Sequence, residues 1–274
     1  MSKGYVPLRE QYDNSVSHAL EYYIADFALS RFAEALGKKK DAEMFYKRSL
    51  GYKHYYSKEF GTFRPILPDG TFYSPFNPRQ GENFEPNPGF HEGSAWNYSF
   101  YVPHDVYGLA KLMGGKNPFI KKLQMVFDEG LYDPANEPDI AYAHLFSYFR
   151  GEEWRTQKET QRLLDKYFTT KPNGIPGNDD TGTMSAWAIF NMIGFYPDCP
   201  GLPEYTLTTP VFNKVTNRLD PKWYKEKELV IESNRTQPGT LYINKVLLNG
   251  KKFNQYRITH DELVHSQRIL FDLK

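Results

Sequence analysis

Residues 15–37 read SVSHALEYYIADFALSRFAEALG, and this stretch decides the fold. Its apolar side chains recur at three- and four-residue steps, the spacing of one face of an amphipathic helix. They are Val16, Leu20, Ile24, Phe27, Ala28 and Phe32. Gly37 follows the pattern and suits the position after a helix end, where a left-handed backbone is common. The sequence therefore predicts a helix over 15–36.

More helices are expected after this one. A second helix is predicted at about 41–57, with Asp41 as its N-cap. The others are predicted at 103–113, 117–129, 138–149, 153–168 and 183–194. Short helices in succession favour antiparallel packing of helix on helix. The segment 58–95 is different, because it is rich in Pro, Gly and Phe with little helical period, and its length is typical of a functional loop.

The pattern changes from helix to strand near residue 200. Strand-like stretches lie at 204–208, 228–232, 241–248 and 267–273. Asn249-Gly250 is a strong signal for a tight hairpin turn. We therefore expect a mainly α fold, with a helical part over 1–200 followed by a small β-rich module over 201–274.

The composition of the 274 residues excludes several functional classes. A formal net charge of +1 gives no electrostatic reason to bind nucleic acid or an anionic membrane surface. No apolar run reaches the roughly 18 residues that a membrane-spanning helix requires. Cys199 is alone, so the chain forms no disulfide framework and no cysteine zinc site of its own. The first residues lack the apolar core of a signal peptide.

Two acidic segments are candidates for catalysis. Residues 177–187 read GNDDTGTMSAW and place Asp179 and Asp180 between two glycines. Turn glycines fix the backbone, and a fixed backbone can aim a carboxylate as a general base requires. The second segment, 91–98, contains Glu92 among aromatic residues. An acid and a base on distant loops are typical of glycosidases, whereas the alternative for Asp179 is an N-cap of the next helix.

Four segments together resemble glycoside hydrolase family 92, the calcium-dependent inverting exo-α-mannosidases. They read EGSAWNY at 92–98, VPHD at 102–105, NEP at 136–138 and GNDDTGTMSAW at 177–187. Their order and spacing make the match specific, and the opening helix and the terminal β segment fit as well. The resemblance covers nearly the whole chain.

The resemblance implies that the helical part is a partial (α/α) toroid of antiparallel helix hairpins, followed by the small β module. The chain then resembles a C-terminal piece of the catalytic region. A partial toroid exposes apolar helix faces, which self-association or a missing N-terminal region would cover. For such a family member we expect a secreted, periplasmic or cell-surface location.

The resemblance also assigns catalytic roles. Glu92 is implied as the general acid, with a pKa raised by partial desolvation among aromatic rings; the alternative is a surface glutamate. Asp180 is implied as the general base that activates water on the opposite face of the sugar. Asn178 stands at the other base-associated position, where some family members carry a carboxylate. Asp179 is expected to support the turn.

A calcium ion bridging two mannose hydroxyl groups is a further implication of the resemblance. Calcium takes oxygen ligands, and Asn136 and Glu137 are the candidate ligands because an Asn-Glu-Pro turn places two oxygen-bearing side chains before a helix start. The alternative for this pair is helix capping together with a favourable charge at the helix start.

Sugar-binding candidates lie between these segments. Trp96 and Tyr98 carry rings that can stack on a sugar, and Asn97 takes the place where the family often has glutamine. His104 and Asp105 are candidates for hydrogen bonds to sugar hydroxyl groups. The alternative for His104 is a buried histidine that ties two helices together.

The function that follows is hydrolysis of terminal α-mannosidic linkages in glycans, similar to that of α-1,2-mannosidases. The acid is Glu92, the base is Asp180, and the cofactor is Ca²⁺. Because the chain resembles only part of the catalytic region, we expect it to be weakly active or inactive alone. One alternative is a non-catalytic carbohydrate-binding or structural fragment. Another is a different α/α-toroid enzyme such as a lyase.

Overall fold

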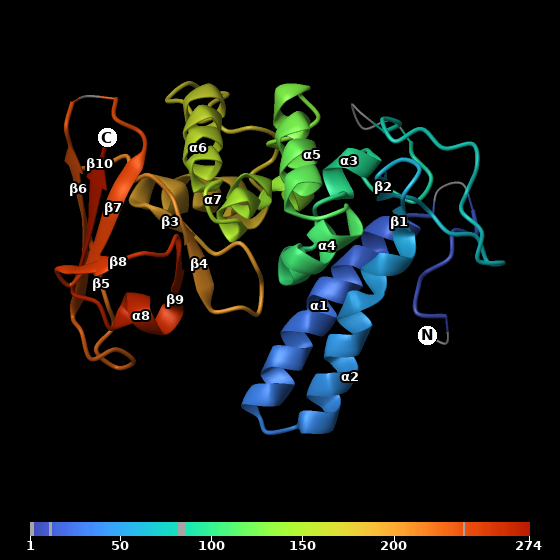
Figure 1. Ribbon diagram of the computed structural model, residues 1–274, viewed down its shortest axis with the longest axis horizontal. Helices are drawn as coiled ribbons and strands as arrows, with labels where there is room; N and C mark the ends of the chain where they lie inside the picture. Colours follow the sequence, from blue (N-terminus) through green and yellow to red (C-terminus); the bar gives the residue numbers. More distant parts are fainter. Residues whose placement is uncertain (1–2, 11–12, 82–85, 238) are drawn as a thin grey trace. The chain divides into compact units, whose positions relative to one another are not determined.

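The computed structural model of the protein describes residues 3–10, 13–81, 86–237 and 239–274. The chain divides into two compact units. Unit 1 is Met1–Tyr142 together with Cys199–Leu202, and unit 2 is Ala143–Asp198 together with Pro203–Lys274. Figure 1 follows the chain from the blue helices of unit 1 to the red strands of unit 2. This division does not test the predicted boundary between 1–200 and 201–274, which stays a prediction.

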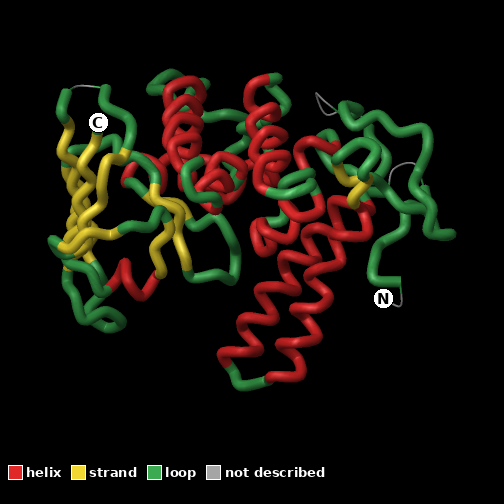
Figure 2. Tube along the Cα trace, in the orientation of Figure 1, coloured by secondary structure: helices red, strands yellow, loops and turns green. Residues whose placement is uncertain are grey.

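Unit 1 begins with a helical hairpin, drawn as two long red helices in Figure 2. Helix α1 spans Ser15–Ala35 and α2 spans Lys39–Ser49, followed by a 3₁₀ segment, η1, at Leu50–Tyr55. Gly37 has φ of 71°, and the amides of Gly37 and Lys38 donate to the carbonyls of Glu34 and Ala33 at 2.9 and 2.8 Å. These two bonds satisfy carbonyls that the helix end leaves free, so the first predicted helix and its end are confirmed.

Three details of this hairpin differ from the prediction. The predicted second helix is too long, because α2 ends at Ser49 and η1 continues only to Tyr55. Asp41 is not the N-cap, because α2 already begins at Lys39 and Asp41 lies in its first turn, where a negative charge favours the positive end of the helix dipole. Phe32 is not in the core, because it is 63% exposed. It belongs to a second apolar face of α1 at three- and four-residue steps, whose exposed members are Tyr22, Leu29, Phe32 and Leu36.

The aromatic-rich segment after α2 has little regular structure, as predicted. Strands β1 (Tyr56–Ser57) and β2 (Thr62–Phe63) form a short antiparallel pair. Beyond them the buried guanidinium group of Arg64 lies 5.0 to 5.5 Å from the ring centroids of Phe60, Phe72 and Phe76. A cation over aromatic faces is stabilising, especially when it is desolvated. The Arg64 side chain therefore holds three aromatic residues of this loop together.

The remaining helices of the described chain are mostly where the sequence places them. They are α3 (Ala95–Tyr98), α4 (Val106–Leu112) after η3 (Pro103–Asp105), α5 (Lys116–Asp128), α6 (Glu153–Tyr167), α7 (Thr183–Ile193) after η6 (Asp180–Gly182), and α8 (His260–Val264). The predicted α-helix at 138–149 is wrong, because this stretch forms the 3₁₀ segments η4 (Glu137–Asp139) and η5 (Tyr142–Tyr148). Residues 142–146 are all buried, so packing on every side decides the backbone there rather than an amphipathic period.

Unit 2 contains two sheets. In the first, the strand order is β5 (Lys214–Arg218), β6 (Glu228–Arg235), β10 (Arg268–Leu273), β7 (Ile243–Leu248) and β8 (Lys251–Phe253). In the second it is β3 (Phe195–Tyr196), β4 (Glu204–Leu207) and β9 (Arg257–Thr259). Strands β6 and β10 are parallel and all other pairs are antiparallel. Asn249-Gly250 forms the predicted tight turn between β7 and β8, with φ of 50° and 80°.

Both sheets contribute to a single hydrophobic cluster. Leu207 and Ile258 from the smaller sheet and Ile231, Ile269 and Phe271 from the larger one are each 1% exposed. The strands of the larger sheet alternate buried and less buried residues, which is most regular along β10, as expected when one face of a sheet covers a core. The mainly α fold with a small C-terminal β region is thus confirmed, whereas the partial toroid stays a prediction. None of the described helices has the length and apolar character to cross a membrane.

We expect Ile269→Ala to lower the free energy of unfolding by about 2–5 kcal/mol, because it removes buried methyl groups and leaves a cavity. The matched control is Ile189→Ala on α7, where the same atoms are removed from a side chain that is 59% exposed, and where the expected change stays within about 0.5 kcal/mol. Urea unfolding followed by circular dichroism measures both. Equal destabilisation by the two variants would contradict the assigned core.

Candidate active site

Glu92, the predicted general acid, lies in the loop that leads into α3. Its backbone is left-handed, with φ of 49°, a conformation that glycine adopts freely and that costs other residues about 1 kcal/mol or more. Its side chain is 60% exposed, and Oε1 lies 3.5 Å from Nε2 of His91. The sequence led us to expect a desolvated carboxyl group among aromatic rings. The described part of the chain instead leaves most of the Glu92 side chain in contact with solvent.

The start of α1 holds the backbone just before Glu92. The amide of Ser17 donates to the carbonyl of Gly89 at 3.2 Å, and Ser17 Oγ accepts from the amide of His91 at 2.9 Å. The hydroxyl group of Tyr98 donates to the carbonyl of His91 at 2.7 Å. The loop is therefore attached to regular helices on both sides, which restricts where Glu92 can lie.

Asn97 fixes the backbone just after Glu92. Its Oδ1 accepts from the amide and the hydroxyl group of Ser94 at 2.8 and 2.9 Å. Its Nδ2 donates to Asp139 Oδ2 at 2.9 Å and to the Leu131 carbonyl at 3.3 Å. A side-chain amide has two donors and two acceptor sites, and all four are used here. Asn97 is thus a positioning residue, and its contact with a sugar stays a prediction.

Asn136 approaches the same loop from the segment after α5. Its Nδ2 donates to the carbonyl of Glu92 at 2.7 Å. Gly93 is tightly packed beside this bond, because a Cβ atom there would lie 3.0 Å from Asn97 Oδ1 and 3.1 Å from Asn136 Nδ2, and both amides would have to move slightly. The structure therefore brings together the predicted acid and one of the two predicted calcium ligands.

Asn136 and Glu137 offer oxygen atoms of the type that calcium binds. Because Nδ2 of Asn136 faces a carbonyl, its Oδ1 is the atom left over, and it has no partner among the described residues. Asn136 makes no side-chain capping bond to η4, so helix capping does not account for it. The two residues supply at most three of the about six to eight oxygens that calcium takes. They fit one side of a calcium site and leave the rest to water, a sugar or other residues.

Within the ranges that the structure describes, no group of three His, Cys, Asp or Glu side chains is placed to hold a metal ion. A calcium site is compatible with this finding, since amide and carbonyl oxygens also serve as calcium ligands.

The other predicted sugar-binding residues lie within the packing of unit 1. Trp96 and Tyr98 are 8% and 4% exposed. His104 is buried with its Nε2 donating to the Ser49 carbonyl at 3.0 Å, which is the alternative of a histidine that ties two elements together. Asp105 caps the amino end of α4. Each of these side chains has a structural role, and their contact with a sugar stays a prediction.

In unit 2, the two adjacent carboxylates of the 177–187 turn behave differently. Asp179 accepts hydrogen bonds from the hydroxyl group of Ser185 and, at 2.9 Å, from its amide. These bonds lower the pKa of Asp179 and cap α7. Asp180 is exposed, and its carboxylate makes no hydrogen bond or ion pair with any described residue. Asp179 therefore supports the turn, as predicted, while Asp180 is left free to act. Asn178 is exposed beside them.

Backbone strain marks both predicted catalytic loops. Among the described residues, the non-glycine residues with positive φ are Glu92 at 49°, Thr181 at 53° and Asn249 at 50°. Asn249 is accounted for by its hairpin turn. The other two are the predicted acid and the neighbour of the predicted base. Strained residues of this kind concentrate at functional sites, where the surrounding structure holds them in place.

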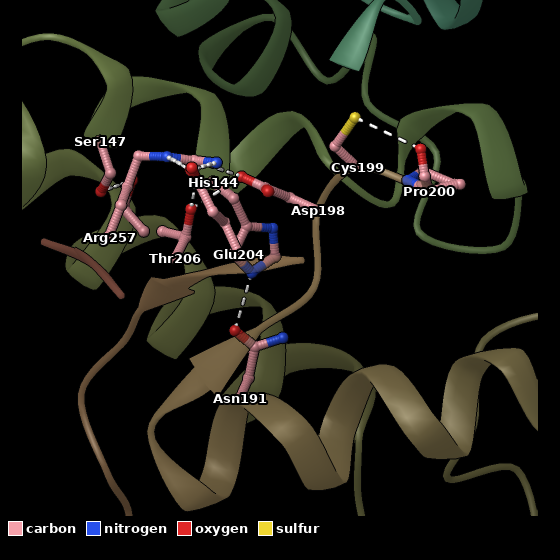
Figure 3. A network of polar contacts seen from close by, with 10 residues as sticks. His144, Ser147, Asn191, Asp198, Cys199, Pro200, Glu204, Thr206 and Arg257 are labelled. Atoms are coloured by element: carbon pink, nitrogen blue, oxygen red, sulfur yellow. Dashed lines mark hydrogen bonds and ion pairs between the residues drawn. The ribbon is translucent and has the colours of Figure 1, made fainter. Parts of the chain in front are cut away.

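Sequence reasoning missed a buried polar network in unit 2, shown in Figure 3. Arg257 on β9 donates to Asp198 Oδ2 at 2.9 Å and to Glu204 Oε2 at 3.0 Å, and its guanidinium group lies 3.9 Å from the ring centroid of Tyr148. Burial lowers the pKa of Arg257, but the charge of Asp198, the neighbouring Tyr148 and the hydrogen bonds to Glu204 and Asp198 together raise it above its usual value. The partners are far apart in sequence, so no local pattern predicts this network, which ties β9 to β4.

The whole sequence also matches a known protein family. A family model described as "Glycosyl hydrolase family 92 catalytic domain" matches residues 1–274. The chain belongs to glycoside hydrolase family 92. Within this family, the segments that hold Glu92, Asn136 and Asp180 are the segments on which the sequence resemblance rests.

Solved structures of family 92 are similar to this chain over its whole length. A family 92 α-mannosidase from Bacteroides thetaiotaomicron, in complex with mannoimidazole, is 30% identical, with a TM-score of 0.90 over 99% of this chain and 37% of that one. A family 92 inverting mannosidase from the same species is 31% identical, with a TM-score of 0.88 over 100% of this chain and 39% of that one.

A curated relative also matches nearly the whole of this chain and only part of its own length. It is an uncharacterized secreted glycosidase of Arthroderma benhamiae, 26% identical over 286 residues, which cover 95% of this chain and 36% of the relative. This family 92 chain therefore spans well under half the length of the relatives that it matches.

We expect Glu92→Gly to be more stable than Glu92→Ala by about 1 kcal/mol, because only glycine adopts the left-handed backbone without strain. Both variants remove the same carboxylate, so the difference reports the backbone. The control pair is Glu43→Gly and Glu43→Ala on α2, where alanine should be the more stable by about 1 kcal/mol. Chemical denaturation measures all four, and the same sign at both positions would contradict the strain assigned to Glu92.

We expect His104 to make unit 1 less stable in acid. Burial lowers the pKa of His104, and the bond to the Ser49 carbonyl and the charge of Asp105 offset this only in part, while Lys53 adds to the lowering. An unfolded histidine takes up a proton near about pH 6.5. The stability that the neutral imidazole contributes is therefore fully present above about pH 6.5. It is lost as pH falls toward the lower pKa of the folded state, by at most about 1.4 kcal/mol per pH unit.

Urea unfolding at several pH values between about 7.5 and 5 measures this loss. His104→Gln should show a weaker pH dependence than the unchanged protein. His265→Gln is the control, because the His265 side chain is 58% exposed, and it should leave the pH dependence unchanged. An identical pH dependence in His104→Gln would show that this histidine does not titrate with unfolding.

Proposed function

We propose that this chain carries the acid and base of a family 92 hydrolase that cleaves terminal α-linked mannose from glycans with inversion. The observation that supports this best is the state of Asp179 and Asp180. The first carboxylate is used to cap α7 and the second is exposed without a partner, on a turn strained at Thr181. A general base needs such an aimed and available carboxylate.

In the proposed reaction, the Glu92 carboxyl group gives its proton to the glycosidic oxygen as the bond to the anomeric carbon breaks. Asp180 takes a proton from the water that attacks the anomeric carbon on the opposite face. Asn178 cannot act as a base, and the Asp179 carboxylate is bound to Ser185, so Asp180 acts as the base alone. Asn136 and Glu137 would hold calcium, which would supply a positive charge able to attract sugar hydroxyl oxygens.

The exposure of Glu92 bears on how active this chain is alone. A general acid at neutral pH needs a raised pKa, and desolvation is the usual cause. The Glu92 side chain is 60% exposed, and the relatives are more than twice as long as this chain. We infer that the chain by itself is weakly active or inactive, and that the region it lacks relative to these proteins covers the acid.

Exposed apolar side chains support the alternative of a non-catalytic fragment that needs a partner. Tyr22, Leu29, Phe32 and Leu36 form an exposed stripe on α1, and an exposed apolar stripe of this kind is typical of an interaction surface. Our proposal also includes a preference for α-1,2 linkages, a partial toroid and a location outside the cytoplasm. The relative described as secreted supports this location.

The test is turnover of an aryl α-mannoside by residues 1–274 with added calcium. We expect a low rate that falls by about 10²- to 10⁴-fold in Glu92→Gln and in Asp180→Asn, since each removes a proton-transfer group. Asp179→Asn is the matched control at the neighbouring carboxylate. It should lower the stability of the turn and reduce the turnover rate less than Asp180→Asn does. Proton NMR of the first sugar released should show the β anomer.

Three outcomes distinguish the proposed hydrolase from an inert fragment and from a lyase. Equal turnover in Glu92→Gln, or release of the α anomer, would rule out the proposed mechanism. No turnover in the unchanged chain, together with no heat of binding for mannose in the presence of calcium, would establish the inert-fragment alternative. An unsaturated product that absorbs in the ultraviolet would indicate a lyase instead.

A further inference from the structure

Unit 2 contains an open hollow that lies among α6, β7 and the end of β10. Its volume is about 430 Å³, and it is lined by Glu153, Trp154, Gln157, Tyr242, Ile243, Tyr256 and Lys274. Ligand sites generally measure about 300–1,000 Å³ and combine apolar walls with a few placed polar groups. None of these residues belongs to the loops of the candidate active site.

The walls of the hollow are aromatic and still accessible. Trp154 and Tyr242 are 39% and 37% exposed, and Tyr256 is half-buried. The guanidinium group of Arg155 lies 4.5 Å from the ring centroid of Trp154 and is itself bound to Glu152 at 2.9 Å. This stack holds the indole ring in place, so a ligand would not have to order it.

Gln157 supplies a fixed donor at the base of the hollow. It is 2% exposed, and its Oε1 accepts from the amide of Ile243 at 2.9 Å. Because the oxygen is used in this way, Nε2 faces away from Ile243, and it has no partner among the described residues. Gln157 lines the hollow, so this nitrogen can donate to a ligand bound there. A ligand with an acceptor atom would satisfy it.

Glu153 supplies an acceptor at the rim. Its Oε2 accepts from the amide of Gly151 at 2.7 Å, while Oε1 has no partner within the described chain. Burial raises the pKa of Tyr256, and the charge of Glu153 adds to this effect, so the Tyr256 phenol keeps its proton. The polar groups that line the hollow are thus both donors and acceptors.

This combination matches one pyranose ring. A sugar presents C–H bonds on one face, which are attracted to the negative faces of aromatic rings, and hydroxyl groups at its edge, which both donate and accept. The mixed donors and acceptors match the hydroxyl groups of a neutral ligand. We propose that this hollow is a second carbohydrate-binding site, which holds one neutral hexose residue of a glycan away from the catalytic loops. That the hexose is a mannoside rests on the proposed function.

The experiment uses the indole N–H signals of the four tryptophans in ¹H–¹⁵N spectra of residues 1–274. Trp154→Phe and Trp223→Phe assign two of the signals by their loss. Methyl α-mannoside is then added in the presence of EDTA, which removes any contribution from a calcium-dependent site. We expect the Trp154 signal to move in a saturable way with a dissociation constant on the order of millimolar, as for a single exposed sugar. The Trp223 signal, from a side chain that is 71% exposed and outside the hollow, should not move.

Variants connect the signal to the hollow. Tyr242→Ala should weaken binding by about fivefold, the factor expected for one lost aromatic contact. Tyr22→Ala is the matched control, because it removes a similarly exposed tyrosine from α1 and should change nothing. Glu153→Gln keeps the acceptor for Gly151 and should weaken binding by a smaller factor. A Trp154 signal that stays still up to about 50 mM ligand, or that moves in parallel with Trp223, would overturn the proposal.

The two proposals can fail separately. A saturable Trp154 shift without Glu92-dependent turnover would support the second site and count against the proposed catalysis. Turnover that depends on Glu92, together with an unmoved Trp154 signal, would support the proposed catalysis and count against the second site.

Discussion

The hydrogen bond from Asn136 Nδ2 to the carbonyl of Glu92, at 2.7 Å, is the contact on which the organisation of the candidate acid loop depends. It holds the peptide group of a residue whose backbone is left-handed and therefore strained. It also leaves the other amide atom of Asn136, Oδ1, without a partner among the described residues. One bond thus links the placement of the acid to the chemistry expected beside it.

The neighbours of this bond are specialised for holding the loop. Asn97 uses all four of its hydrogen-bonding positions on Ser94, Leu131 and Asp139, and Gly93 is tightly packed against Asn97 and Asn136. Residues with saturated hydrogen bonds position others, whereas residues with free atoms can act on a ligand. By this criterion, Glu92 and Asn136 in unit 1, and Asp180 in unit 2, have atoms that can contact a ligand. In the turn of unit 2, Asp179 has the same holding role as Asn97.

Unit 2 applies the same distinction outside the catalytic loops. Arg257 is bound to two carboxylates and covers the ring of Tyr148, so it fastens strands and offers nothing to a ligand. Gln157 fastens the start of β7 with one amide atom and keeps the other free. Gln157 is therefore held in place by its oxygen, and its nitrogen is the atom that the proposed sugar site would use.

The sequence by itself determined the helices α1, α6 and α7, the strands β4, β6, β7 and β10, and the turn at Asn249-Gly250, because these follow from periodicity and turn chemistry over a few residues. It also indicated the segments around Glu92 and Asp180. Only the tertiary structure decided that 138–149 forms 3₁₀ segments, that Phe32 is exposed, and that His104 is buried. It also decided that Asp179 is the cap while Asp180 is free. These outcomes depend on partners such as Ser49, Ser185 and Asp139 or on packing from every side, and burial and hydrogen-bond satisfaction are properties of a site rather than of a local pattern.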